Sequence, residues 1–129
     1  HAAVLDTCEW LATRGFNVVH LPVQPNGLVR LEDVRAVVDA RTLIVAVMLV
    51  NNEIGVVQPV GEIAALAHSA GALMLCDAVQ GFGRMTVPEG PDLVAACAHK
   101  IHGPKMVGAL WVRGGLELKP LIHGGGQEQ

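Results

Sequence analysis

Two hydrophobic patterns alternate along the chain. Some segments carry apolar residues at the spacing of an amphipathic helix, and others are short apolar runs rich in Ile, Val and Leu. The helical spacing predicts helices over residues 2–14, 31–38 and 59–70. The apolar runs predict strands over residues 16–21, 42–49, 72–76, 93–97 and 108–112, with a turn over residues 22–27. This alternation is typical of βαβ units and predicts an α/β fold with a mostly parallel, helix-covered sheet.

The run over residues 42–49 is almost wholly apolar, so we expect a strand that is buried on both faces. Asn26-Gly27 is the strongest turn signal in the chain. No repeat, low-complexity stretch or flexible linker divides the 129 residues. We therefore expect a single folded unit over residues 1–129.

Composition excludes several classes of function. Hydrophobic residues make up 51% of the chain, and its formal net charge is only -3. This balance argues for a folded protein without a nucleic-acid-binding surface. The longest apolar run, residues 43–50, is too short to span a bilayer. Three separated cysteines without a C-x-x-C pair favour a reducing compartment, so we expect a cytoplasmic protein with no membrane partner.

Polar residues directly follow three of the predicted strands. They occupy residues 51–53, 77–80 and 99–100. Ligands of parallel sheets gather at the carboxyl ends of the strands. We therefore expect these three segments to face one crevice and to converge on one ligand.

Each polar residue admits a functional and a structural interpretation. Lys100 can form a Schiff base with a carbonyl cofactor, or it can be a solvated loop lysine. Asp77 can pair with a buried cation such as a pyridinium nitrogen, or it can cap a helix or a turn. Gln80 and Asn52 carry amides that suit either a cofactor or a turn.

A metal site is a further alternative. His99, His102 and His123 are potential ligands, but their spacing matches no known type of metal site. We therefore expect no metal. The glycine motifs that bind dinucleotides or triphosphates are absent from the sequence.

Taken together, six segments resemble the motifs of group I cysteine desulfurases, in the order in which that family has them. They are residues 1–5, 50–55, 77–80, 98–105, 108–113 and 123–128. The family belongs to the class V aminotransferase branch of the fold-type I enzymes that use pyridoxal 5'-phosphate (PLP). The resemblance implies that the chain is an incomplete large domain of a PLP-dependent transferase.

The resemblance also implies roles for individual residues at the cofactor. Lys100 would hold the cofactor as a Schiff base and carry a proton, and His1 would stack on the ring; these two are the implied catalytic residues. Asp77 would pair with the pyridinium nitrogen, and Gln80 would donate to the phenolate oxygen. Together they describe the ring-binding half of a PLP site.

The remaining implied contacts concern the phosphate and the substrate. His99 would contact the phosphate, and Cys97 stands where the family usually has a hydroxyl residue that does so. A thiol is a weaker donor than a hydroxyl. Asn52 would contact the cofactor and help to position the substrate carboxylate. The implied reaction converts L-cysteine into L-alanine and an enzyme persulfide, in a homodimer that passes the sulfur to a scaffold protein for iron–sulfur clusters.

The resemblance leaves alternatives open. The family's phosphate loop would lie before residue 1, and its nucleophilic cysteine and carboxylate-binding arginine beyond residue 129. We therefore expect this chain alone to be inactive and poorly soluble, with exposed apolar surface. Selenocysteine lyase and class V aminotransferase remain alternative activities on the same fold. A non-catalytic remnant of the fold is a third alternative.

Overall fold

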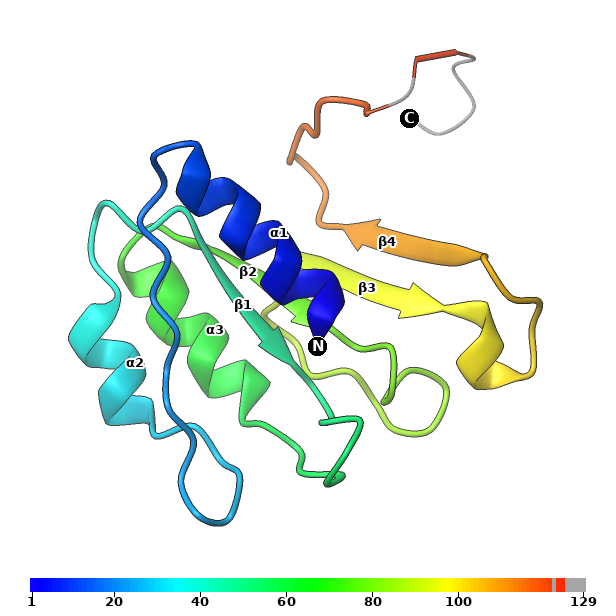
Figure 1. Ribbon diagram of the computed structural model, residues 1–129, viewed down its shortest axis with the longest axis horizontal. Coiled ribbons are helices and arrows are strands. Elements are labelled where there is room, and N and C mark those ends of the chain that lie inside the picture. The colour runs from blue at the N-terminus through cyan, green and yellow to red at the C-terminus, as the bar shows by residue number, and fades with distance from the viewer. Residues whose placement is uncertain (122, 125–129) are drawn as a thin grey trace.

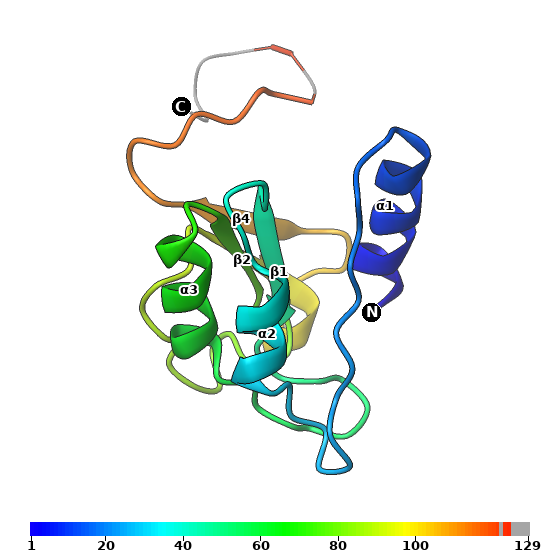
Figure 2. The ribbon, with the colours of Figure 1, turned by 90° about the vertical axis from the view of Figure 1, so that its left-hand side faces the viewer.

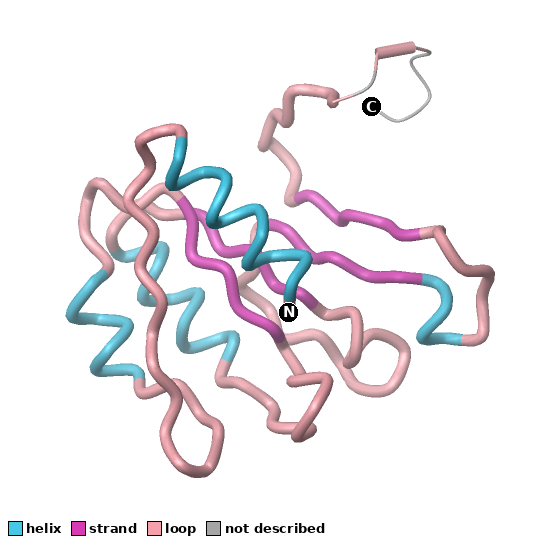
Figure 3. The backbone as a smooth tube through the Cα atoms, in the orientation of Figure 1, coloured by secondary structure: helices cyan, strands magenta, loops and turns pink. Residues whose placement is uncertain are grey.

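A computed structural model of the chain describes residues 1–121 and 123–124. Its elements follow one another in the order shown in Figure 1 and, by type, in Figure 3. They are α1 (Ala2–Thr13), α2 (Leu31–Val37), β1 (Ile44–Met48), α3 (Val60–Ser69), β2 (Leu73–Asp77), β3 (Leu93–Cys97), the 3-10 helix η1 (Ala98–Ile101) and β4 (Gly108–Val112). The three predicted helices and four of the five predicted strands are present, each with both bounds within two residues of the prediction.

The four strands form one sheet in the order β1-β2-β3-β4. β1 and β2 are parallel, with Met48 opposite Asp77, and β2 and β3 are parallel, with Asp77 opposite Ala95. β4 returns antiparallel to β3. The prediction of a mostly parallel sheet is therefore confirmed.

The hydrophobic core lies between one face of the sheet and the helices α2 and α3. Apolar side chains from both layers meet there and are almost fully buried: Val34, Leu49, Val60, Ile63, Ala64, Ala67, Ala72, Met74, Cys76 and Ala78. Figure 2 shows α1 on the opposite side of the sheet from α2 and α3. Within the described chain, α1 buries none of its residues. Close helix packing therefore covers one face of the sheet.

Two details of the sequence prediction are wrong. Within the described part of the chain no segment pairs with residues 16–21, so this stretch is not a strand. β1 is not buried on both faces, because it is an edge strand and Ile44 is 44% exposed. Apolar runs favour strands, but hydrogen bonding and coverage depend on which neighbours are present.

A buried carboxylate ties the amino-terminal edge of the sheet together. Asp92 is fully buried just before β3. Its Oδ2 accepts hydrogen bonds from the backbone N–H of Met74 at 2.6 Å and from Nε2 of His68 at 2.9 Å. Nη1 of Arg113 lies 2.8 Å from Oδ1 as an ion pair. One side chain thus links α3, β2, β3 and the end of β4.

The predicted turn over residues 22–27 is confirmed. Oδ1 of Asn26 accepts the N–H of Leu28, and Gly27 has a φ of +82°. Among residues 1–121 and 123–124, no helix has the length and apolar character needed to cross a membrane.

Candidate functional site

The parallel strands bring the three polar segments to one edge of the sheet. Met48 and Asp77 are opposite one another near the carboxyl ends of β1 and β2, and Asp77 is opposite Ala95 in β3. The segments that follow these strands are residues 51–53, 78–80 and 98–101, and all three leave from this edge. The three segments therefore share one edge of the sheet, and their convergence on one ligand in one crevice stays a prediction.

Asp77 is the last residue of β2, and its carboxylate serves the turn that follows. Oδ1 accepts the backbone N–H of Val79 at 3.0 Å, which confirms the turn interpretation for that oxygen. Within the described residues no hydrogen bond to Oδ2 is formed. Met74 and Cys76 face the core, so strand alternation directs Asp77 to the other face, over which α1 lies (Figure 2).

Lys100 lies in η1, directly after β3. The carbonyl of Ala98 accepts hydrogen bonds from the backbone N–H groups of His102 and Gly103, which closes the turn. His102 adopts a left-handed conformation with φ of +66°. This tight turn ends the strand abruptly and places the partly buried Lys100 at the carboxyl edge of the sheet.

The segment after β1 forms a turn of its own. Oδ1 of Asn51 accepts the N–H groups of Glu53 and Ile54 at 2.9 and 3.0 Å. Asn51 therefore has the structural role that amides often have in turns. Asn52 is exposed in the same turn.

The two residues implied at the cofactor phosphate lie side by side. Sγ of Cys97 is 3.8 Å from Nε2 of His99. Cys97 ends β3 and His99 lies in η1, so the strand-to-turn junction places both side chains. A thiol and an imidazole can each donate to a phosphate oxygen.

His1 is the N-cap residue of α1, which lies on the far side of the sheet from the core helices (Figure 2). Its Nδ1 accepts the backbone N–H of Ala3 at 3.1 Å and so caps the helix. The sequence pattern gave no signal for this cap, because histidine is not a preferred N-cap residue. His1 is exposed, and α1 lies on the side of the sheet toward which Asp77 is directed.

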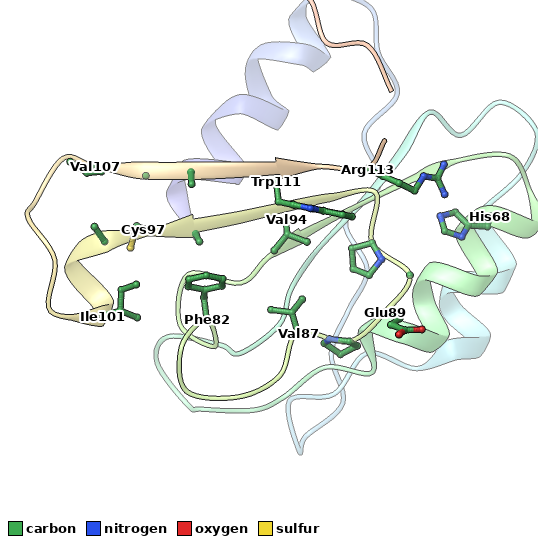
Figure 4. Close-up of a pocket in the computed structure, with 17 residues that line it drawn as sticks. His68, Phe82, Val87, Glu89, Val94, Cys97, Ile101, Val107, Trp111 and Arg113 are labelled. Carbon is green, nitrogen blue, oxygen red and sulfur yellow. The ribbon is translucent and has the colours of Figure 1, made fainter. Parts of the chain in front are cut away.

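A cavity of about 830 Å³ lies on the other face of the sheet, over β3 and β4 and beside α3. Figure 4 shows Phe82, Val94 and Trp111 among its lining residues. Cys97 also lines it, but Lys100, Asp77 and Gln80 do not. Sequence reasoning missed this cavity, which depends on what covers the sheet rather than on any motif.

The three cysteines have different environments. Cys76 is fully buried, and burial, followed by the charge of Asp77, raises the pKa of its thiol to about 11. Cys8 and Cys97 are partly exposed. A thiol with so high a pKa is almost wholly protonated at neutral pH, so Cys76 is a core residue rather than a nucleophile.

The metal alternative finds no support in the geometry. Within residues 1–121 and 123–124, His99, His102 and His123 do not form part of any group of three or more potential metal ligands. Most of the motif at 123–128 lies outside the described residues.

The donor set at the carboxyl edge fits a PLP molecule. An amine, a carboxylate, an amide, a thiol and an imidazole come from adjacent segments: Lys100, Asp77, Gln80, Cys97 and His99. Oδ2 of Asp77 has no donor in the described chain and suits a protonated ring nitrogen. Each type of group on the cofactor therefore has a chemical partner here.

The whole chain, residues 1–129, matches the model of the aminotransferase class-V family, and it belongs to that family. Among curated proteins, cysteine desulfurase IscS of Rickettsia akari is 43% identical over 134 aligned residues, which cover all of this chain and 33% of that protein. A mitochondrial cysteine desulfurase of Arthroderma benhamiae is 45% identical, over all of this chain and 27% of that protein. The chain thus spans about a third of the length of these relatives.

Solved structures agree with this assignment. A NifS-like protein superposes with a TM-score of 0.92 and 41% identity, over 99% of this chain and 36% of that one. The structure titled SspA in complex with cysteine gives a TM-score of 0.94 and 38% identity, over 99% of this chain and 38% of that one. The predicted α/β fold class is therefore confirmed.

Proposed function

We propose that this chain forms the lysine-bearing part of a PLP site in a cysteine desulfurase. The observation that carries the proposal is the convergence of three strand ends on one edge of the sheet, with Lys100, Asp77 and Asn52 on adjacent segments. The similarity to cysteine desulfurases over the whole chain supports the same reaction.

Different residues of this chain would bind different parts of the cofactor. The amine of Lys100 would bind its aldehyde carbon and would move a proton at the substrate Cα. Oδ2 of Asp77 would accept the N–H of the pyridinium ring and keep that nitrogen protonated. His1 would stack on the ring, and its place on the same side of the sheet as Asp77 supports this role. When bound, PLP supplies an electron sink for charge that develops on the substrate.

Other side chains would orient the phosphate, the phenolate oxygen and the substrate. Cys97 and His99 would bind the phosphate, and their 3.8 Å contact supports a shared target. The amide of Gln80 would donate to the phenolate oxygen. Asn52 would contact the cofactor and guide the carboxylate of L-cysteine into place.

The products would be L-alanine and sulfur held as a persulfide on a cysteine of the enzyme. We propose that the acceptor is a scaffold protein for iron–sulfur clusters, that the enzyme is a homodimer and that it is cytoplasmic. The high pKa of Cys76 supports a nucleophile other than this residue.

The test is the absorbance spectrum of the purified chain with added PLP, followed by borohydride reduction and peptide mapping. We expect a visible absorption band and a reduced adduct on Lys100. The variant Lys100→Ala should lose both. Lys105→Ala is the matched control, because it removes a nearby lysine of the same loop and should keep both.

An adduct spread evenly over all lysines, both in this chain and in a polypeptide of the relatives' length that contains it, would contradict the proposed cofactor site. The substrate is tested separately, with this chain supplied as part of a polypeptide of the relatives' length. Alanine released from L-cysteine, with a persulfide on the enzyme, would support the desulfurase. Release from selenocysteine alone would favour the lyase, and amino-group transfer without sulfur release would favour the aminotransferase.

A further inference from the structure

The turn that follows β2 contacts the turn that carries Lys100. Nη2 of Arg84 donates a hydrogen bond to the backbone carbonyl oxygen of Lys100 at 3.1 Å. The two residues are 16 positions apart in the chain, so this contact is tertiary. It is the one polar side-chain contact to the backbone of η1 from another element within the described residues.

The same two turns also touch through an apolar contact. A Cβ atom built on Gly83 would lie 2.8 Å from Cγ2 of Ile101, which is closer than real Cβ contacts allow. Gly83 also has a φ of +75°. Glycine at this position therefore lets the backbone lie directly against the side chain that follows Lys100.

The turn over residues 81–85 is held firmly on its other side. The N–H groups of Gly81 and Phe82 donate to the carbonyl of Ala78, and the N–H groups of Arg84 and Met85 donate to the carbonyl of Gly81. A Cβ on Gly81 would lie 2.8 Å from Cδ2 of the fully buried Leu49. The turn is therefore anchored to the core at one end and contacts η1 at the other.

We infer that the 81–85 turn supports the lysine-bearing turn, and that Arg84 is a positioning residue for Lys100. The guanidinium fixes the carbonyl of Lys100, and Gly83 permits the contact with Ile101 that fixes the next residue. Together they set the direction in which the lysine leaves η1. The role toward the lysine rests on the proposed function, whereas the support of the turn does not.

Amide hydrogen exchange tests the support without any cofactor. The N–H groups of His102 and Gly103, which close the turn onto Ala98, should exchange about five-fold faster in Arg84→Ala, as loss of one net hydrogen bond predicts. The N–H of Leu73, which donates to Leu43 in the sheet, should keep its rate.

A conservative variant and a matched control variant distinguish a specific effect on the lysine-bearing turn from a general loss of stability. Arg84→Lys keeps a cationic donor and should restore slow exchange at the turn. Arg35→Ala removes another exposed arginine, on α2, and should leave the turn unchanged. Unchanged exchange in Arg84→Ala, or equal acceleration at Leu73, would overturn the inference.

A second readout follows the lysine itself. The chain holds three lysines, Lys100, Lys105 and Lys119, so the share of borohydride-trapped PLP on Lys100 has two internal references. Arg84→Ala should lower that share about five-fold, and Arg84→Lys should restore it. An unchanged share in Arg84→Ala would overturn the positioning role.

The same labelling distinguishes a failure of the proposed function from a failure of the role inferred for Arg84. A wild-type protein without preference for Lys100, also when this chain is part of a polypeptide of the relatives' length, would contradict the proposed function. The exchange rates at His102 and Gly103 would still decide whether Arg84 supports the turn. Gly83→Ala gives an independent check against Gly15→Ala, because both glycines have positive φ but only Gly83 has a close neighbour. Only Gly83→Ala should accelerate exchange at the lysine-bearing turn, and equal rates in the two variants would count against the contact.

Discussion

Replacing Asp92 tests how the buried carboxylate stabilises the fold. In Asp92→Ala the buried N–H of Met74 loses its acceptor, which costs about 1–3 kcal/mol. His68 and Arg113 also lose their partner, but both side chains are partly exposed and can be hydrated. These two losses add about 1 kcal/mol together. The free energy of unfolding should therefore fall by about 3 kcal/mol.

The isosteric variant separates the hydrogen bond from the charge. Asp92→Asn keeps an oxygen for the N–H of Met74 and should lose only about 1 kcal/mol. Urea unfolding followed by circular dichroism measures both variants. Asp39→Ala is the control, because it breaks the exposed Asp39–Arg41 pair and should leave the free energy of unfolding almost unchanged. Equal losses in the Ala and Asn variants would refute the role given to the Met74 hydrogen bond.

The same carboxylate predicts a pH dependence. Burial alone would raise the pKa of Asp92, but the hydrogen bonds from His68 and Met74 and the charge of Arg113 outweigh burial and lower it. A carboxyl with a lowered pKa in the folded state adds stability that is fully present above its unfolded value of about 4. That stability is lost as the pH falls through the lower folded pKa. The advantage of the wild type over Asp92→Asn should therefore shrink below about pH 4, and an advantage that grew there would refute the assignment.

Two further predictions concern a thiol and a turn. Because the pKa of Cys76 is raised to about 11, iodoacetamide at neutral pH should alkylate Cys8 and Cys97 and leave Cys76 unmodified until the chain unfolds. Peptide mass spectrometry measures this, and early modification of Cys76 would contradict its burial. Gly27→Ala should destabilise the fold by about 2 kcal/mol more than Gly15→Ala, since its Cβ would lie 2.7 Å from the side chain of Ile54 whereas Gly15 has no neighbour. Thermal unfolding of the two variants measures this difference, and equal melting temperatures would show that the turn relaxes.

The sequence predicted β3 and β4 to the residue, because each apolar run ends at a charged or glycine-containing segment. It predicted the shared site edge for a related reason. Consecutive parallel strands must run in the same direction, so the polar residues after them meet at one edge. The pattern could not show which segments pair with a predicted strand or cover its faces. Residues 16–21 have strand character without a strand partner, and Ile44 lies on an edge strand.

The side-chain contacts that stabilise the sheet and the lysine-bearing turn could not be predicted from the pattern, because their partners are remote in the chain. Asp92 precedes an apolar strand, and that position is a weak signal for a structural carboxylate. Its three partners lie 18 to 24 positions away and on three different segments. Arg84 presents the same difficulty, since nothing in its own segment predicts a hydrogen bond to the carbonyl of Lys100. The sequence of a segment indicates where a strand runs, but it does not indicate which remote side chain will contact that segment.

Because of the direction of β4, a stabilising ion pair and the candidate site lie at opposite edges of the sheet. β4 runs back along β3, so Gly108 lies opposite Cys97 at the site edge while Arg113, which follows β4, reaches Asp92 at the other edge. The pair between the buried Asp92 and the half-exposed Arg113 thus helps to hold the strands together at one edge, far from where the cofactor would bind. The site edge keeps only exposed or partly buried polar groups, which remain available for a ligand. A sheet whose strands all ended in buried pairs at that edge would be held more firmly there, but its lysine and carboxylate would already have partners.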